Sequence, residues 1–131
     1  MPDPFVIQPR IVVNAPASAT APAAPLAVDA AFGALAEHCA DPRVTDLFVN
    51  GADGLFIDRG DGAERVAGWA ASEREVRDLA VALIGAGGRH LDDQSPCVDV
   101  RLSSGIRVHA VLAPVSTSGT AVSVRIPRVA A

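Results

Sequence analysis

The chain has 131 residues, which suffices for one domain with a sizeable core but not for two. Its formal net charge of −4 at pH 7 argues against a generally basic nucleic-acid-binding protein. All 11 residues counted as lysine or arginine are arginines, so the Gly-Lys-Ser/Thr sequence of a Walker A phosphate loop cannot occur here.

Residues 1–25 are rich in alanine and proline, and we expect them to form a disordered segment ahead of the folded domain. Residues 11–28 carry no charge, yet they contain three prolines and many alanines, which predicts a linker and not a membrane span. No charged region precedes a leucine-rich run, so we predict neither a signal peptide nor direct membrane insertion.

The folded domain is expected over residues 26–128. It opens with a helix, indicated by apolar residues at helical spacing and ended by Asp41-Pro42. These apolar residues are Val28, Phe32, Leu35, Ala36 and Cys39. Three strands follow, separated by Asn-Gly and Asp-Gly turn sequences. They are expected over Val44–Asn50, Leu55–Arg59 and Glu64–Ala67.

A second helix is predicted after Ser72, which forms a capping-box pattern with Glu75. Apolar residues recur along it at helical spacing, and the Gly-Ala-Gly-Gly sequence at 85–88 is expected to end it. Its apolar face consists of Val76, Leu79, Ala80, Leu83 and Ile84. The glycine run does not fit a dinucleotide-binding loop, because His90 occupies the position of the third glycine.

Three more strands are predicted over Cys97–Leu102, Ile106–Ala113 and Ala121–Ile126. The order of elements is therefore helix, three strands, helix, three strands. We predict an α+β domain in which an antiparallel sheet of about six strands is backed by helices.

Alternation of side chains gives these last strands one apolar face and one polar face, and the polar face carries Arg101, Arg107 and Arg125. A three-residue Ser-Ser-Gly turn would set Arg101 opposite Arg107, and Asp99 opposite His109. Like charges that face each other across two strands are destabilising, and water, a nearby carboxylate or a bound anion could offset that cost. The pattern alone favours exposure to water.

The remaining polar residues have structural interpretations. His38 and His90 have no second ligand at metal-binding spacing, so no metal site is predicted. Cys39 and Cys97 are far apart, and we expect both to be small buried residues in a reducing compartment. No nucleophile is recognisable beside a base, so an independent enzyme is not expected.

Two stretches carry a resemblance to a known family. They are VTDLFVNGADGLFIDRG at residues 44–60 and SPCVDVRLSSGIRVHAVLAPVSTSGTAVSVRIPR at residues 95–128. They are similar to the family patterns V-T-D-I-hydrophobic-V-N-G and P-x-V-D-x-R-L-x-x-G-x-R-V-x-A-V. Over residues 26–128 the chain resembles the N-terminal domain of the traffic ATPases of type II and type IV secretion, in particular the CpaF-like branch that serves tight-adherence (Flp) pili.

The resemblance implies a bacterial hexameric ATPase that is cytoplasmic and peripheral to the inner membrane, at a secretion or pilus-assembly platform. In this family the N-terminal domain packs over a RecA-like motor domain, and its arginines reach the phosphates of ATP bound with Mg²⁺ at the motor's P-loop. By motif position these are Arg107 in G-x-R-V and Arg125 in V-R-I, with Arg101 in V-D-x-R-L as a third candidate. The resemblance makes phosphate contact the favoured interpretation of the three arginines.

No Walker motif follows Arg128 in this sequence, so we expect this chain to lack the motor domain. We therefore expect the chain alone to bind no cofactor and to hydrolyse no ATP. Its expected partners are the RecA-like domain and neighbouring subunits of the hexamer, and not nucleic acid. The alternative is a stand-alone adaptor or anion-sensing module that uses the same sheet face to bind a protein carboxylate or a phosphorylated partner.

Overall fold

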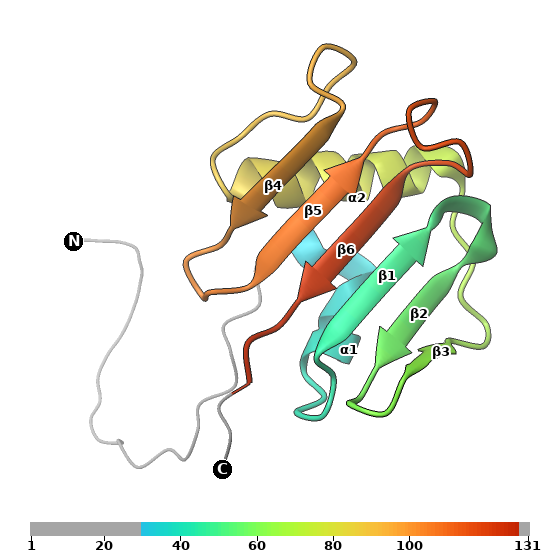
Figure 1. Ribbon diagram of the computed structural model, residues 1–131, viewed down its shortest axis with the longest axis vertical. Coiled ribbons are helices and arrows are strands. Elements are labelled where there is room, and N and C mark those ends of the chain that lie inside the picture. The colour runs from blue at the N-terminus through green and yellow to red at the C-terminus, as the bar shows by residue number, and fades with distance from the viewer. Residues whose placement is uncertain (1–29, 129–131) are drawn as a thin grey trace.

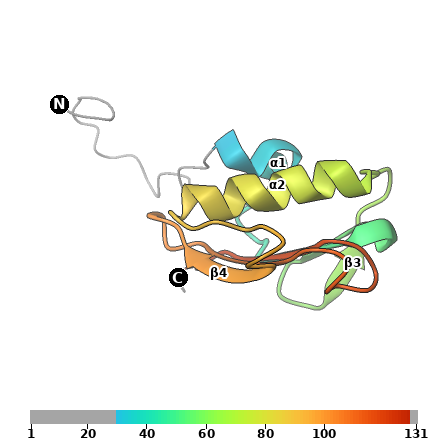
Figure 2. The ribbon, with the colours of Figure 1, turned by 90° about the horizontal axis from the view of Figure 1, so that it is seen from above.

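In the part of the chain that the structure describes, six strands pair into one antiparallel sheet, and the helices cover one of its two faces (Figures 1 and 2). The computed structural model describes residues 30–128. The helices are η2 (Ala30–Leu35), α1 (Ala36–Cys39), η3 (Gly51–Asp53) and α2 (Glu73–Ala86). The strands are β1 (Asp46–Asn50), β2 (Leu55–Asp58), β3 (Ala63–Arg65), β4 (Cys97–Arg101), β5 (Arg107–Val111) and β6 (Ala121–Arg125). The predicted α+β class and order of elements are confirmed.

The last strand of the chain lies in the middle of the sheet. The strand order is β3-β2-β1-β6-β5-β4, so β6 pairs with β1 on one side and with β5 on the other. This places the strands of the N-terminal half and the three C-terminal strands edge to edge, as Figure 1 shows. The β1–β6 pairing is what joins the two halves of the chain into a single sheet.

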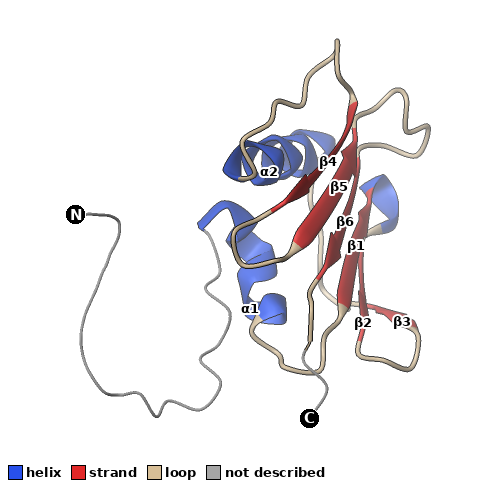
Figure 3. Ribbon diagram, turned by 60° about the vertical axis from the view of Figure 1, so that its left-hand side comes forward, coloured by secondary structure: helices blue, strands red, loops and turns tan. Residues whose placement is uncertain are grey.

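The core lies between the sheet and the helices (Figure 3). The alternating apolar side chains of the strands are buried there, and α2 packs across β4, β5 and β6. The fully buried large residues include Phe32, Leu35, Leu47, Leu55, Leu83, Ile84, Ile106, Leu112 and Ile126. No helix within residues 30–128 covers the opposite face of the sheet, which we call the open face, and the polar side chains of the same strands face away from the core there.

Helix α2 has the ends that the sequence predicted. The Ser72 hydroxyl accepts a hydrogen bond from the Glu75 backbone N–H at 3.1 Å, and the Glu75 carboxylate accepts one from the Ser72 N–H at 2.8 Å. Gly87 caps the other end. A Cβ at Gly87 would lie 2.5 Å from Val100 Cβ, so only glycine allows α2 to approach β4 this closely.

The N-terminal helix differs from the single helix that the spacing predicted. A 3₁₀ helix precedes one turn of α-helix, because Gly33 adopts φ 50° and ψ −124°, which no regular helix contains. Phe32, Leu35 and Cys39 are buried, so the spacing did identify the core-facing residues. The expectations for Val28 and for the segment 1–25 fall outside the described residues.

Two further expectations need correction. All six strands are shorter than predicted; β1 begins at Asp46, β3 spans Ala63–Arg65, and β5 spans only Arg107–Val111. Cys97 is exposed, whereas Cys39 is buried as expected. The reason lies in strand alternation: Val98 points into the core, so Cys97 must point to the open face.

Candidate functional site

Three arginines stand side by side at one end of the open face. Strand pairing sets Arg101 directly opposite Arg107, and Arg107 directly opposite Arg125, on β4, β5 and β6. The register predicted for the β4–β5 hairpin is confirmed, including the Asp99–His109 pair. All three arginines are exposed. We call Arg101, Arg107 and Arg125 the arginine row.

The arginine row continues into carboxylates on the next two strands. Arg125 faces Asp46 on β1, and Asp46 faces Asp58 on β2. Arg125 Nε donates to Asp46 Oδ1 at 3.0 Å, although the Arg125 side chain is 74% exposed and that of Asp46 only 13%. Within residues 30–128, Arg101 and Arg107 form no ion pair or side-chain hydrogen bond. A carboxylate therefore offsets the charge at one end of the row only, and the other two arginine side chains are exposed.

A shallow depression of about 580 Å³ lies over the arginine row. It is lined by Thr45, Asp46, Arg101, Gly105, Arg107, Arg125, Ile126, Pro127 and Arg128. An arginine can present two parallel N–H donors to a phosphate or carboxylate, and several arginines around one hollow suit an anion with more than one charge.

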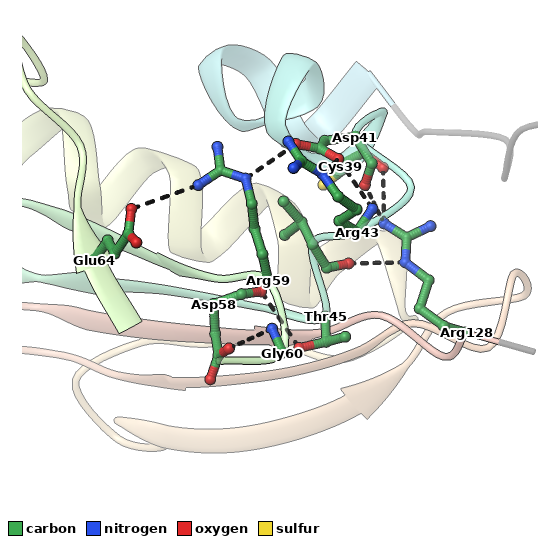
Figure 4. A network of polar contacts seen from close by, with 10 residues as sticks. Cys39, Asp41, Arg43, Thr45, Asp58, Arg59, Gly60, Glu64 and Arg128 are labelled. Carbon is green, nitrogen blue, oxygen red and sulfur yellow. Dashed lines mark hydrogen bonds and ion pairs between the residues drawn. The ribbon is translucent and has the colours of Figure 1, made fainter. Parts of the chain in front are cut away.

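Arg128 lines the same depression, but main-chain oxygens accept hydrogen bonds from its Nε and Nη2 groups (Figure 4). Its Nε donates to the Val44 carbonyl at 2.7 Å, and its Nη2 donates to the carbonyls of Asp41 at 2.7 Å and Cys39 at 3.4 Å. These contacts bind the end of the described chain to the loop between α1 and β1. Arg128 is thus a structural residue, in contrast to Arg101 and Arg107.

Asp41 organises that same loop (Figure 4). Its carboxylate accepts hydrogen bonds from the Arg43 backbone N–H at 2.9 Å and from Arg59 Nε at 3.1 Å. These two bonds, the backbone one first, lower the pKa of Asp41 from 3.8 to about 2. The loop that holds Arg128 is therefore itself fixed by charged hydrogen bonds.

Among residues 30–128, no group of three or more His, Cys, Asp or Glu side chains could hold a metal ion. No helix of this part of the chain is long and apolar enough to cross a membrane.

The sequence did not identify two residues that form side-chain contacts on this face. One is Asp46, whose position beside Arg125 depends on the long-range pairing of β1 with β6. The other is Cys97, whose Sγ lies 4.0 Å from His109 Nε2. Strand alternation was the available signal for Cys97, because it places this residue on the same face as Asp99 and His109.

The chain was compared with known proteins. No family model matches it. Two proteins of Mycobacterium tuberculosis, from strains CDC 1551 / Oshkosh and ATCC 25618 / H37Rv, carry the provisional name conjugal transfer protein and are each 42% identical to it over 90 residues. The match covers 64% of this chain but only 26% of each relative.

Among solved structures, the fold is similar to part of the VirB11 ATPase from the Brucella suis type IV secretion system, crystallised in complex with sulphate. The TM-score is 0.56 at 21% sequence identity, and the similarity covers 70% of this chain and 28% of the VirB11 chain. At this identity the similarity concerns the fold.

Proposed function

We propose that this domain is the N-terminal domain of a secretion or pilus-assembly ATPase, related to those of type IV secretion and of the CpaF-like branch. It packs over a RecA-like motor domain and supplies Arg107 and Arg125, with Arg101 as a third contact, to the phosphates of bound ATP. The observation that carries the proposal is the arginine row, in which three exposed guanidinium groups share one end of an open sheet face.

Both comparisons support the proposal. The relatives are named for conjugal transfer, and the similar fold belongs to an ATPase of a type IV secretion system. The chain spans 26% of each relative and 28% of the VirB11 chain. We therefore propose that it corresponds to one domain of a larger machine. From the family resemblance we further propose that this machine is a cytoplasmic hexamer at an inner-membrane secretion or pilus platform.

The motor domain and this domain would contribute different groups to the nucleotide site. The motor domain provides the P-loop lysine and the Mg²⁺ site, neither of which this lysine-free chain can supply. The arginine row then adds positive charge from the opposite side of the nucleotide, where charge-assisted contacts to phosphate are strong. Arg125 would exchange the carboxylate of Asp46 for a phosphate, whereas Arg107 needs no such exchange.

The domain alone should bind ATP only weakly. Each arginine–phosphate contact contributes about 1.5–3 kcal/mol where water is excluded, and less on an open face. Association costs at least about 4 kcal/mol, so two such contacts give a Kd of about 1 mM or weaker. Micromolar binding by calorimetry in moderate salt would contradict this account.

ATP turnover tests the proposal in a protein that joins this domain to a RecA-like motor domain of the family. Replacing Arg125 or Arg107 by alanine should lower turnover tenfold or more, about 1.4 kcal/mol, with the hexamer intact. The matched control is Arg74→Ala, because Arg74 lies on α2, on the other side of the sheet, and is 85% exposed. Equal turnover in all variants would contradict phosphate contact, and loss of partner binding alone would support the adaptor alternative.

A further inference from the structure

A cysteine, a histidine and an aspartate meet on the open face at the edge of the sheet. Cys97 and Asp99 lie on the edge strand β4, and His109 lies next to them on β5. His109 Nδ1 is 2.6 Å from Asp99 Oδ1, and its Nε2 is 4.0 Å from Cys97 Sγ. The imidazole therefore lies between a thiol and a carboxylate.

The carboxylate determines which imidazole nitrogen faces the thiol as an acceptor. An ionised Asp99 can only accept a hydrogen bond, so in the neutral ring the proton resides on Nδ1 and the lone pair on Nε2. This Nε2 atom is the ring nitrogen that lies 4.0 Å from the Cys97 sulfur. A nucleophile, a base within reach of it, and a third group that orients the base make up the arrangement that activates cysteine in many proteins.

Reagents can reach Cys97 but not the other thiol of the chain. Cys97 is exposed, and the His109 side chain beside it is 42% exposed. Cys39 is 3% exposed, and burial raises the pKa of its thiol to about 11. Since the thiolate is the reactive form, the raised pKa makes Cys39 inert. Cys97 is the accessible thiol with a base beside it, and Cys39 serves as the comparison.

We propose that Cys97 is a base-assisted thiol-exchange site that forms mixed disulfides with small anionic disulfides. In the exchange, the Cys97 thiol gives its proton to His109 Nε2, and the sulfur attacks one sulfur of the disulfide. A new S–S bond forms, the original S–S bond breaks, and the departing thiolate takes up the proton. The disulfide is the oxidant, and one of its halves leaves as the free thiol.

The charges around His109 favour an anionic disulfide. A shallow depression of about 300 Å³ on the open face is lined by both members of the His109–Asp99 pair and by Asp46, Arg107, Ser123 and Arg125. Among the residues that line this depression, Asp46 pairs with Arg125 and Asp99 with His109, whereas the Arg107 guanidinium forms no ion pair within residues 30–128. It can attract the carboxylates of a reagent such as oxidised glutathione.

Two reagents test the proposal on the full chain. Neutral iodoacetamide measures how readily the thiol reacts, without any charge attraction, and oxidised glutathione measures the exchange itself. Mass spectrometry should locate both products on Cys97 and not on Cys39. His109→Gln should slow alkylation at pH 7 about tenfold, less than a base achieves in an enclosed site. His90→Gln makes the same change at an exposed histidine that follows α2 and does not line this depression, and it should leave the rate unchanged.

Asp99 is a positioning residue, and its role has a separate readout. Asp99→Asn should slow alkylation, and imidazole ¹⁵N chemical shifts should show that the Nδ1–H form is no longer dominant. Arg107→Gln should slow reaction with oxidised glutathione more than reaction with iodoacetamide. Circular dichroism must show that every variant is folded, as expected for exposed positions.

Three results would overturn the proposal. The first is an alkylation rate in His109→Gln within about twofold of the wild type, well short of the effect of a base. The second is an Arg107→Gln variant that reacts with iodoacetamide as slowly as His109→Gln does. That result would show that a nearby positive charge, and not a base, makes the thiol reactive. The third is glutathione attached to Cys39 at the same rate as to Cys97. None of these measurements involves a motor domain, so the outcome is independent of the proposed ATPase role.

Discussion

Arg125 and Asp46 are 79 residues apart in the chain, and their side chains meet at 3.0 Å across the β6–β1 pairing. This contact lies at the boundary where the arginine row changes into carboxylates. Asp46 is the better buried partner and Arg125 the better exposed one. Asp46 thus keeps Arg125 in a fixed direction while it competes with any anion that approaches the row.

Removing that competition should strengthen anion binding. Asp46→Asn should lower the Kd of the isolated domain for ATP about threefold, because an exposed ion pair contributes at most about 1 kcal/mol. Isothermal calorimetry at low ionic strength measures the change. Asp78→Asn is the control, since it removes a carboxylate that pairs with Arg74 on α2, away from the row. Equal effects of the two variants would mean that net charge, and not release of Arg125, determines the affinity.

The two faces of β5 should respond differently to truncation. Val108 is 1% exposed, so Val108→Ala should lower the free energy of unfolding by about 1–3 kcal/mol. Arg107→Ala should change it by no more than about 0.5 kcal/mol, because this exposed residue faces like charges on both neighbouring strands. Urea denaturation measures the free energy of unfolding of both variants. A large destabilisation by Arg107→Ala would show that the row has a structural role.

The contact between α2 and β4 gives a test of packing with an internal control. Gly87→Ala should destabilise the domain by about 1–3 kcal/mol, because the added Cβ would lie 2.5 Å from Val100 Cβ. Gly85→Ala, two residues earlier, has no atom within 4 Å of its added Cβ and should be neutral or stabilising by up to about 1 kcal/mol. Thermal denaturation should show opposite shifts. Equal shifts would contradict the close approach at Gly87.

Asp41 should make stability depend on pH in the acid range. Its pKa falls from 3.8 to about 2 on folding, so the native state favours the ionised form. The stabilisation is fully present above about pH 4 and is lost as the pH falls through about 2. Wild type should therefore be more stable than Asp41→Asn at pH 7, and the difference should shrink between about pH 4 and pH 2. A difference that stays constant over this range would contradict the assignment.

Local features of this fold could be read from the sequence, and long-range ones could not. The Ser-Ser-Gly turn determines the register of Arg101 against Arg107, because hairpin loops fix register through their length. Alternation likewise separates the core face from the open face. The pairing of β1 with β6 joins segments from opposite ends of the described chain, and no local pattern encodes it. The Asp46–Arg125 contact depends on that pairing, so it was missed.

The break in the N-terminal helix was missed for a different reason. Apolar spacing reports which residues face the core, and it was right for Phe32 and Leu35. It does not report the backbone angles of Gly33, which adopts a conformation that other residues rarely reach. The exposure of Cys97 was within reach of the alternation argument, since the residue precedes the buried Val98.

The most direct test of the proposed function is a crystal structure of this domain joined to a RecA-like motor domain, with a non-hydrolysable ATP analogue bound. We expect guanidinium nitrogens of Arg107 and Arg125 to lie within about 3.2 Å of phosphate oxygens, and Arg125 to have left Asp46. An arginine row that faces solvent, with Arg125 still paired to Asp46 and the nucleotide held by the motor domain alone, would contradict it.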